Sequence, residues 1–131
     1  SLNDLHKEFK PLAKSLFDTA KDRGLDPVVV QTLRPREYQQ WLWEQGRTRS
    51  GKIVTWARPG QSAHEYGLAI DIAPRSVLKL PGWAPEDPIW NELGKIGLAL
   101  GLSWGVMKPK GRTDLNHFDH PKWRDITGVK K

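Results

Sequence analysis

The sequence contains no cysteine among its 131 residues. Disulfide bridges and thiolate metal sites are therefore excluded, and any bound metal has to be held by histidine, aspartate or glutamate. Nor is there an apolar stretch near the roughly 20 residues that a membrane-spanning helix requires, so we expect no insertion into a membrane. Residues 1 to 25 lack the uninterrupted apolar segment of a signal peptide, and we expect no export signal.

Acidic residues are in the minority, because 15 Asp and Glu stand against 21 Lys and Arg, which gives a formal net charge of +6. This excess favours an anionic partner such as nucleic acid, an anionic membrane surface or a bacterial cell wall. A nucleic-acid binder would show a clustered basic stripe with interleaved aromatics, and apart from the run KPKGR at 108 to 112 the basic residues are spread out. We therefore expect no nucleic-acid partner.

The order of predicted elements indicates an α+β fold in a single domain covering residues 1 to 131. An apolar stripe at helical spacing predicts a first helix between about residue 3 and Gly24, with Asn3 or Asp4 as its N-cap. The stripe consists of Leu5, Phe9, Leu12, Leu16 and Ala20. Further helices are predicted at 35 to 46 and 87 to 101, strands at 27 to 30, 67 to 73, 102 to 104 and 115 to 118, and a long loop at 46 to 63.

The strand at 67 to 73 carries a carboxylate, Asp71, in an otherwise apolar run. Removing an ionised carboxylate from water costs several kcal/mol unless a basic side chain, backbone N–H groups or a metal ion compensates it. Strand alternation points Ala69 and Asp71 to one side and Ile70 and Ile72 into the core. Gly67 allows a sharp turn, so His64 can reach the same point as Asp71.

A second cluster, TDLNHFDH at 113 to 120, supplies His117 with Asp114 three residues before it. Two histidines and one aspartate would leave a fourth position open, which is the layout of a catalytic zinc site. Asp114 would then be the spare carboxylate that acts as general base. A hydrogen-bonded His–Asp pair without metal is the alternative interpretation of His64 and Asp71.

The run SAHEYGLAID resembles the SxHxxGxAxD signature of the LAS metallopeptidases, the M15 family. This family includes D-Ala-D-Ala peptidases and L-alanyl-D-glutamate endopeptidases of phage endolysins. The stretches LRPREYQQWLWEQGRT and GKIVTWARPGQSAHEYGLAID are similar to the endopeptidase branch, and with the DLNHFD segment the likeness covers roughly residues 4 to 123. It implies a small antiparallel sheet with packed helices, as in the Hedgehog and D-Ala-D-Ala-peptidase fold.

The resemblance also implies roles for individual residues. The zinc ligands would be His64, Asp71 and His117, and Asp114 would be the catalytic acid/base. Arg34 would hold and polarise the substrate, and Gln39 and Ser62 would be further pocket residues. Leu33, Pro35 and Val106 depart from residues common in the family, which leaves the metal site unchanged but affects the expected substrate preference.

The implied function is a zinc-dependent peptidoglycan endopeptidase that cleaves the L-Ala-D-Glu bond, in a phage endolysin. Such a lysin would act as a monomer, accumulate in the host cytoplasm and reach the wall after the membrane is breached. Two alternatives are a D-Ala-D-Ala carboxypeptidase with the same site and a non-catalytic wall-binding module. For three residues outside the ligand set, we expect Glu65 on the surface or in a loop, Asp119 orienting a neighbour and Trp56 stacking on glycan.

Overall fold

The centre of the molecule is a four-stranded antiparallel sheet, seen in a computed structural model that describes residues 1–105 and 114–131. Its strands are β1 (Pro27–Gln31), β2 (Ala69–Pro74), β3 (Ser103–Trp104) and β4 (His117–Asp119), in the order β1-β2-β4-β3. The α+β prediction is therefore confirmed. The KPKGR run and Val106 lie outside the described residues.

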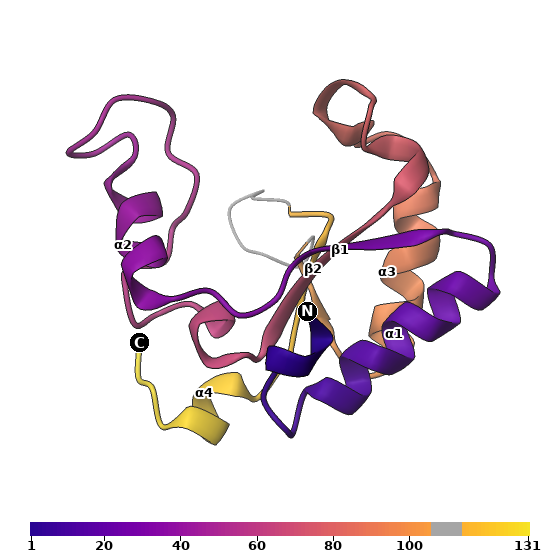
Figure 1. Ribbon diagram of the computed structural model, residues 1–131, viewed down its shortest axis with the longest axis horizontal. Helices are drawn as coiled ribbons and strands as arrows, with labels where there is room; N and C mark the ends of the chain where they lie inside the picture. The colour runs from indigo at the N-terminus through magenta and orange to yellow at the C-terminus, as the bar shows by residue number, and fades with distance from the viewer. Residues whose placement is uncertain (106–113) are drawn as a thin grey trace.

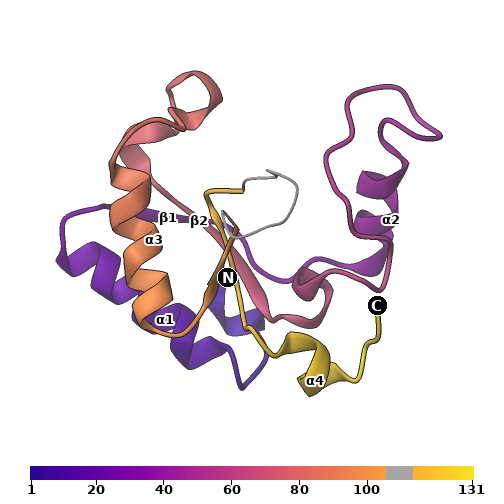
Figure 2. The same ribbon diagram turned by 180° about the vertical axis from the view of Figure 1, so that it is seen from behind.

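The helices lie at the two ends of this sheet. In both views α1 (Lys10–Asp22) and α3 (Ile89–Ala99) lie side by side at one end (Figures 1 and 2). Helix α2 (Arg36–Glu44) and the loop after it lie at the other end, with the short α4 (Trp123–Thr127) below them (Figures 1 and 2). Short 3-10 helices occur at Leu2–Asp4, Ala63–Tyr66, Arg75–Val77 and Pro81–Trp83. No helix in the described part of the chain is long and apolar enough to cross a membrane.

The core lies between the sheet and the helices α1 and α3. Across the sheet, Ile70 pairs with Phe118 and Phe118 with Trp104, so one row of large apolar side chains crosses three strands. Helix α3 packs on this row at Gly94 and Gly97, which approach Trp104 and Phe118 closely, and Leu93 and Ile96 of the same helix are buried. Burying each such side chain stabilises the fold by roughly 1.5–3 kcal/mol.

The prediction for the start of the first helix was wrong. The chain before Lys10 is not continuous helix, although Leu5 and Phe9 are buried as their spacing indicated. One cause is that the His6 amide donates to the Gly67 carbonyl at 2.9 Å and so is not available for a helical hydrogen bond. The other is that Pro11 lies in the first turn of α1, where the missing N–H of proline has no helical partner to lose.

The remaining α-helices and strands agree with the sequence predictions within a few residues, with two differences, and the 3-10 helices were not predicted. Helix α4 was not predicted, because its five residues are too short to show a periodic pattern. Ala69 is fully buried, so the face of β2 that carries Asp71 is covered at that position and is not open along its whole length.

We predict that Gly97→Ala destabilises the protein by about 1–3 kcal/mol. A Cβ at Gly97 would lie 2.4 Å from Cε2 of Phe118, whose ring is fully buried and cannot move aside. The free-energy cost of this overpacking should exceed the stabilisation of up to about 1 kcal/mol that alanine gains over glycine from helix propensity. Urea unfolding measures the change.

The matched control is Leu98→Ala on the same helix, where the side chain is 43% exposed and the change should stay within about 0.5 kcal/mol. A Gly97→Ala protein as stable as the wild type would contradict this account of the α3–sheet contact.

Candidate metal centre

The site begins with a row of polar residues on the opposite face of the sheet from the Ile70–Phe118–Trp104 row. Asp71 on β2 is the direct partner of His117 on β4 and of Gln31 on β1. Side chains of directly opposed residues lie about 4.5–5.5 Å apart at Cβ. The register of three strands therefore places Gln31, Asp71 and His117 side by side, and a slip of one residue would turn Asp71 into the core.

His64 is brought to this row by the 3-10 helix Ala63–Tyr66 and the turn that follows it. The Ser62 hydroxyl accepts from the His64 amide at 3.3 Å and caps the helix. Gly67 then reverses the chain with φ of +70°, in the left-handed region that glycine adopts without strain. The turn predicted from Gly67 is confirmed.

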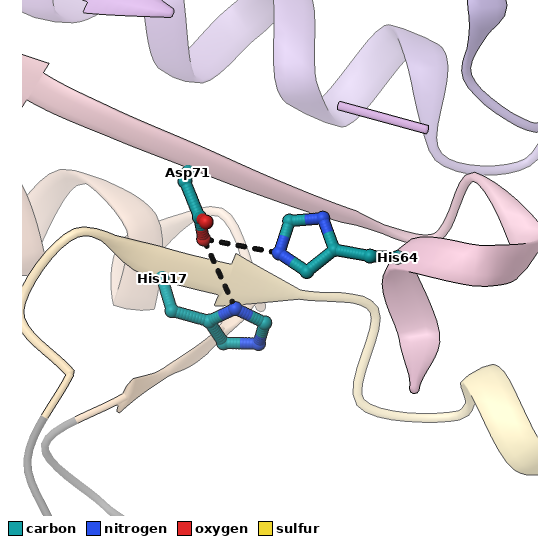
Figure 3. A group of neighbouring side chains, drawn as sticks. All are labelled: His64, Asp71 and His117. Carbon is teal, nitrogen blue, oxygen red and sulfur yellow. Dashed lines mark hydrogen bonds and ion pairs between the residues drawn. The ribbon is translucent and has the colours of Figure 1, made fainter. Parts of the chain in front are cut away.

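The side chains of His64, Asp71 and His117 converge (Figure 3). Asp71 Oδ1 lies 3.0 Å from His64 Nε2 and 3.2 Å from His117 Nδ1, and one ligand atom from each residue lies within 4.8 Å of the others. Ligand atoms of a tetrahedral zinc site are about 3.3 Å apart, given metal bonds of about 2.0–2.1 Å. The donor set and its spacing thus fit a divalent metal such as zinc.

The second nitrogen of each imidazole is held by the protein. Nδ1 of His64 lies 2.8 Å from the Thr32 carbonyl, which can only accept, so Nδ1 donates and Nε2 faces Asp71. Nε2 of His117 donates to Asp119 Oδ2 at 2.9 Å, which leaves Nδ1 for the metal position. Such anchoring fixes the tautomer and ring orientation of metal-binding histidines. The structure agrees with the prediction that Asp119 orients a neighbour.

Mutual charge stabilises this cluster in the metal-free protein. Burial raises the pKa of Asp71, but hydrogen bonds from His117 and His64 outweigh it and hold that pKa well below its ordinary value. Burial lowers the pKa of His117, whereas the hydrogen bonds that its ring donates to Asp119 and Asp71 raise it to about 9. The strand carboxylate is therefore paired with positive charge on the imidazoles, and a metal ion held by the same three side chains would take over that charge.

The expectation that Glu65 is a surface or loop residue was wrong, because it lies in the 3-10 helix Ala63–Tyr66 with its side chain buried. Its side chain is 2% exposed, accepts from the amides of Gly60 and Ser62, and lies 3.4 Å from Arg36. Because Ser62 and Glu65 form a reciprocal capping box, Glu65 fixes the 3-10 helix that presents His64. The spacing of Ser62 and Glu65 is the sequence signal that could have shown this.

The metal-binding group opens into a cleft of about 600 Å³. Arg34, Ser62 and Asp114 all line this cleft together with the three metal-binding side chains. The fold thus brings these predicted site residues into one cavity. Gln39 differs, because it is fully buried behind Arg34 instead of forming the surface that a ligand would contact.

Arg34 is positioned by two glutamines. Its Nη1 donates to Gln39 Oε1 at 2.8 Å, and its Nε and Nη2 donate to Gln31 Oε1. The Arg34 amide also donates to the His64 carbonyl at 2.9 Å, which ties the arginine to the metal centre. Burial lowers the pKa of Arg34 and the charge of Asp71 opposes that shift. Gln31 was missed by sequence reasoning, although a polar residue ending the run Val28–Val30 was visible there.

An antiparallel α+β fold with a His–Asp–His group in a cleft has the ligand set and the open position of a catalytic metal site, as metallopeptidases have. The model of the VanY family, described as D-alanyl-D-alanine carboxypeptidase, matches residues 2–123. The chain belongs to this family, and its resemblance to the LAS metallopeptidases is confirmed.

Among curated relatives, the chain is 37% identical over 110 residues to the peptidoglycan L-alanyl-D-glutamate endopeptidase CwlK of Bacillus subtilis (strain 168), an alignment that covers 79% of this chain. The chain spans 66% of the length of CwlK, 44% of YodJ from the same bacterium and 28% of a D-alanyl-D-alanine carboxypeptidase of Enterococcus faecalis.

Solved structures of low sequence identity share the fold. The LdcB LD-carboxypeptidase superposes with a TM-score of 0.70 at 22% identity, covering 95% of this chain and 64% of that one. The vancomycin-resistance D,D-pentapeptidase VanY in complex with Zn(II) superposes with a TM-score of 0.64 at 19% identity. This match covers 95% of this chain and 77% of that one. The L-Ala D-Glu endopeptidase ChiX of Serratia marcescens superposes with a TM-score of 0.60 at 18% identity. This match covers 95% of this chain and 86% of that one.

We predict that Gln39→Ala destabilises the protein by about 1–3 kcal/mol, because partly buried partners of its amide lose their hydrogen bonds. These partners are Arg34, Thr55 and the Ala57 carbonyl. Gln40→Ala is the matched control on the same helix, since Gln40 is exposed and bonds only locally to Glu44. Chemical denaturation should separate the two variants, and equal stabilities would contradict the proposed anchoring.

We also predict that zinc binding at pH 7.5 releases a proton from His117, which has a pKa near 9 and is protonated in the metal-free protein, in addition to any proton lost by water on the zinc. The folded pKa lies above the ordinary 6.5, so this group stabilises the metal-free fold fully below about pH 6.5, and that contribution is lost as the pH rises through 9. Calorimetry in buffers of different ionisation enthalpy measures the number of released protons, which should fall by about one as the pH rises through 9 and His117 loses its proton before zinc binds. Zinc binding without proton release at pH 7.5 would contradict the assignment.

Proposed function

We propose that this chain is a zinc-dependent peptidoglycan endopeptidase that hydrolyses the L-Ala-D-Glu bond of the stem peptide. The observation that carries the proposal is the meeting of the His64–Asp71–His117 group with Arg34 and Asp114 in one cleft. A purely structural metal site has no use for an additional carboxylate and an open position. The same feature disfavours a non-catalytic wall-binding module.

The metal would be held by Nε2 of His64, a carboxylate oxygen of Asp71 and Nδ1 of His117. When bound by two neutral imidazoles and one carboxylate, zinc supplies a net positive charge that acidifies water and polarises a carbonyl group. Asp119 and the Thr32 carbonyl keep the two rings in the orientation that this binding requires.

The chain's own residues would then carry the proton and the developing charge. Asp114 accepts the proton of the attacking water and returns it to the amine that leaves. Arg34 donates from its fixed guanidinium to the carbonyl oxygen as that oxygen becomes negative. A single donor of this kind lowers the barrier by roughly 3–4 kcal/mol in other enzymes. Because Gln31 and Gln39 already orient Arg34, little reorganisation is needed.

The choice of bond is supported by the relationship to CwlK, which is an L-alanyl-D-glutamate endopeptidase. The alternative is a D-Ala-D-Ala carboxypeptidase, which the description of the family model favours. Both use the same metal group, so they differ in the product that is released and not in the mechanism.

We further propose a phage endolysin as the setting, held in the host cytoplasm until the membrane is breached. Support comes from the resemblance of the stretches 33–48 and 51–71 to the endopeptidase branch. The net charge of +6 also suits an anionic cell wall, to which it would give a salt-sensitive attraction.

We predict that Asp114→Asn lowers the rate of peptidoglycan hydrolysis by about 10²–10⁴-fold, since the variant loses its proton acceptor. Zinc binding should persist, because Asp114 is not one of the three metal-binding residues. Mass spectrometry of digested peptidoglycan should show new D-Glu amino groups with the zinc-loaded wild type, and none after EDTA treatment. Asp18→Asn, an exposed aspartate on α1, is the matched control.

Release of single D-Ala residues by the wild type would assign the carboxypeptidase function instead. No cleavage by a protein that still binds zinc would contradict both peptidase assignments.

A further inference from the structure

Trp56 is an exposed aromatic residue that lines the same cleft as the metal-binding group. Its side chain is 62% exposed, more than that of the other large apolar residues on the described surface. Tyr38 and Val54 line the cleft as well and are 42% and 54% exposed. An apolar surface beside polar, charged groups in a cleft is typical of a ligand-binding site.

The loop that carries Trp56 is held in place on both sides of this residue. The buried Gln39 donates from Nε2 to the Ala57 carbonyl at 2.6 Å and to Thr55 Oγ1 at 3.2 Å. Arg47 donates to the Thr55 carbonyl at 3.0 Å and to the Trp43 carbonyl of α2 at 2.6 Å. An indole presented on a fixed segment loses little conformational entropy when a ligand binds to it.

The same glutamine therefore orients both sides of the site. Gln39 Oε1 holds Arg34, while Gln39 Nε2 holds the residues flanking Trp56. The exposed indole is thus built into the framework that positions the substrate-polarising arginine. Arg47, whose guanidinium carbon lies 5.9 Å from the centre of the Trp56 ring, adds positive charge beside it.

The proposed substrate has a particular chemistry next to the cleaved bond. L-Ala is the first residue of the stem peptide and is joined by an amide to the lactyl group of N-acetylmuramic acid. One extended residue spans only about 3.3–3.6 Å. The sugar must therefore lie within a few such lengths of the metal centre, inside or at the rim of the cleft.

We propose that Trp56 forms a subsite for the N-acetylmuramyl sugar, with the apolar face of the sugar ring packed on the indole. This inference rests on the proposed endopeptidase function and extends it from the peptide to the glycan. The enzyme then recognises the stem peptide while it is attached to the wall, and discriminates against peptides already released from the sugar. Burial of the indole against the sugar provides the discrimination.

The test compares two substrates that differ only in the sugar. One is a disaccharide-tripeptide muropeptide, and the other is the lactyl-tripeptide obtained from it by alkaline β-elimination. We expect the zinc-loaded wild type to cleave the muropeptide with a kcat/KM about tenfold or more higher, the size of effect that one anchoring aromatic residue provides. Trp56→Ala should remove this preference and leave cleavage of the lactyl-tripeptide unchanged, and Trp56→Phe should restore part of it.

Trp41→Ala is the matched control, because Trp41 is 48% exposed on the same lobe and is not among the residues that line the cleft. Equal rates on both substrates for the wild type, or an equal loss on both for Trp56→Ala, would overturn the sugar subsite while the endopeptidase function stands. Cleavage at a bond other than L-Ala-D-Glu in both substrates would overturn the proposed function, and the subsite with it.

Discussion

The carboxylate of Asp71 is the group on which the rest of the site depends. It lies in the middle of an apolar strand, where burial disfavours its charge, and two imidazoles compensate that cost. Both compensating contacts are consequences of chain geometry: the register of β2 and β4 supplies His117, and the Gly67 turn supplies His64. A metal ion bound at this point would take over the same compensation with a charge that can act on a substrate.

The two faces of the sheet around this group have different roles. The row from Ile70 to Trp104 packs against α3 and provides the stable framework, while the row from Gln31 to His117 faces the cleft. Polar contacts connect the lobe formed by α2 and its loop to the second row, with the buried Gln39 at their centre. Polar networks of this kind rigidify a site only when every member is satisfied, and Gln39 bonds through both its oxygen and its nitrogen.

Much of this arrangement could be predicted from the sequence, because the decisive signals are local. His64 and Asp71 were identified by three signals: a charged residue in an apolar strand, a glycine after a histidine, and the SxHxxGxAxD pattern. The three-residue spacing of Asp114 and His117 identified the other two members of the site. The long-range contacts could not be predicted in this way. Whether Gln39 touches a ligand or supports Arg34 depends on which way a helix packs, and the burial of Glu65 depends on amides of a loop whose path the sequence does not specify. The early start expected for α1 failed for the same reason, since His6 bonds to a residue 61 positions away.

The most direct test of the central claim is a crystal structure of the zinc-loaded protein with anomalous diffraction measured on both sides of the zinc absorption edge. The account predicts one zinc ion bound by Nε2 of His64, a carboxylate oxygen of Asp71 and Nδ1 of His117, at about 2.0–2.2 Å, with its remaining position directed into the cleft. Asp119 should keep its contact with the other nitrogen of His117. A zinc ion bound through Nε2 of His117 together with Asp119, or held by residues outside this group, would contradict it.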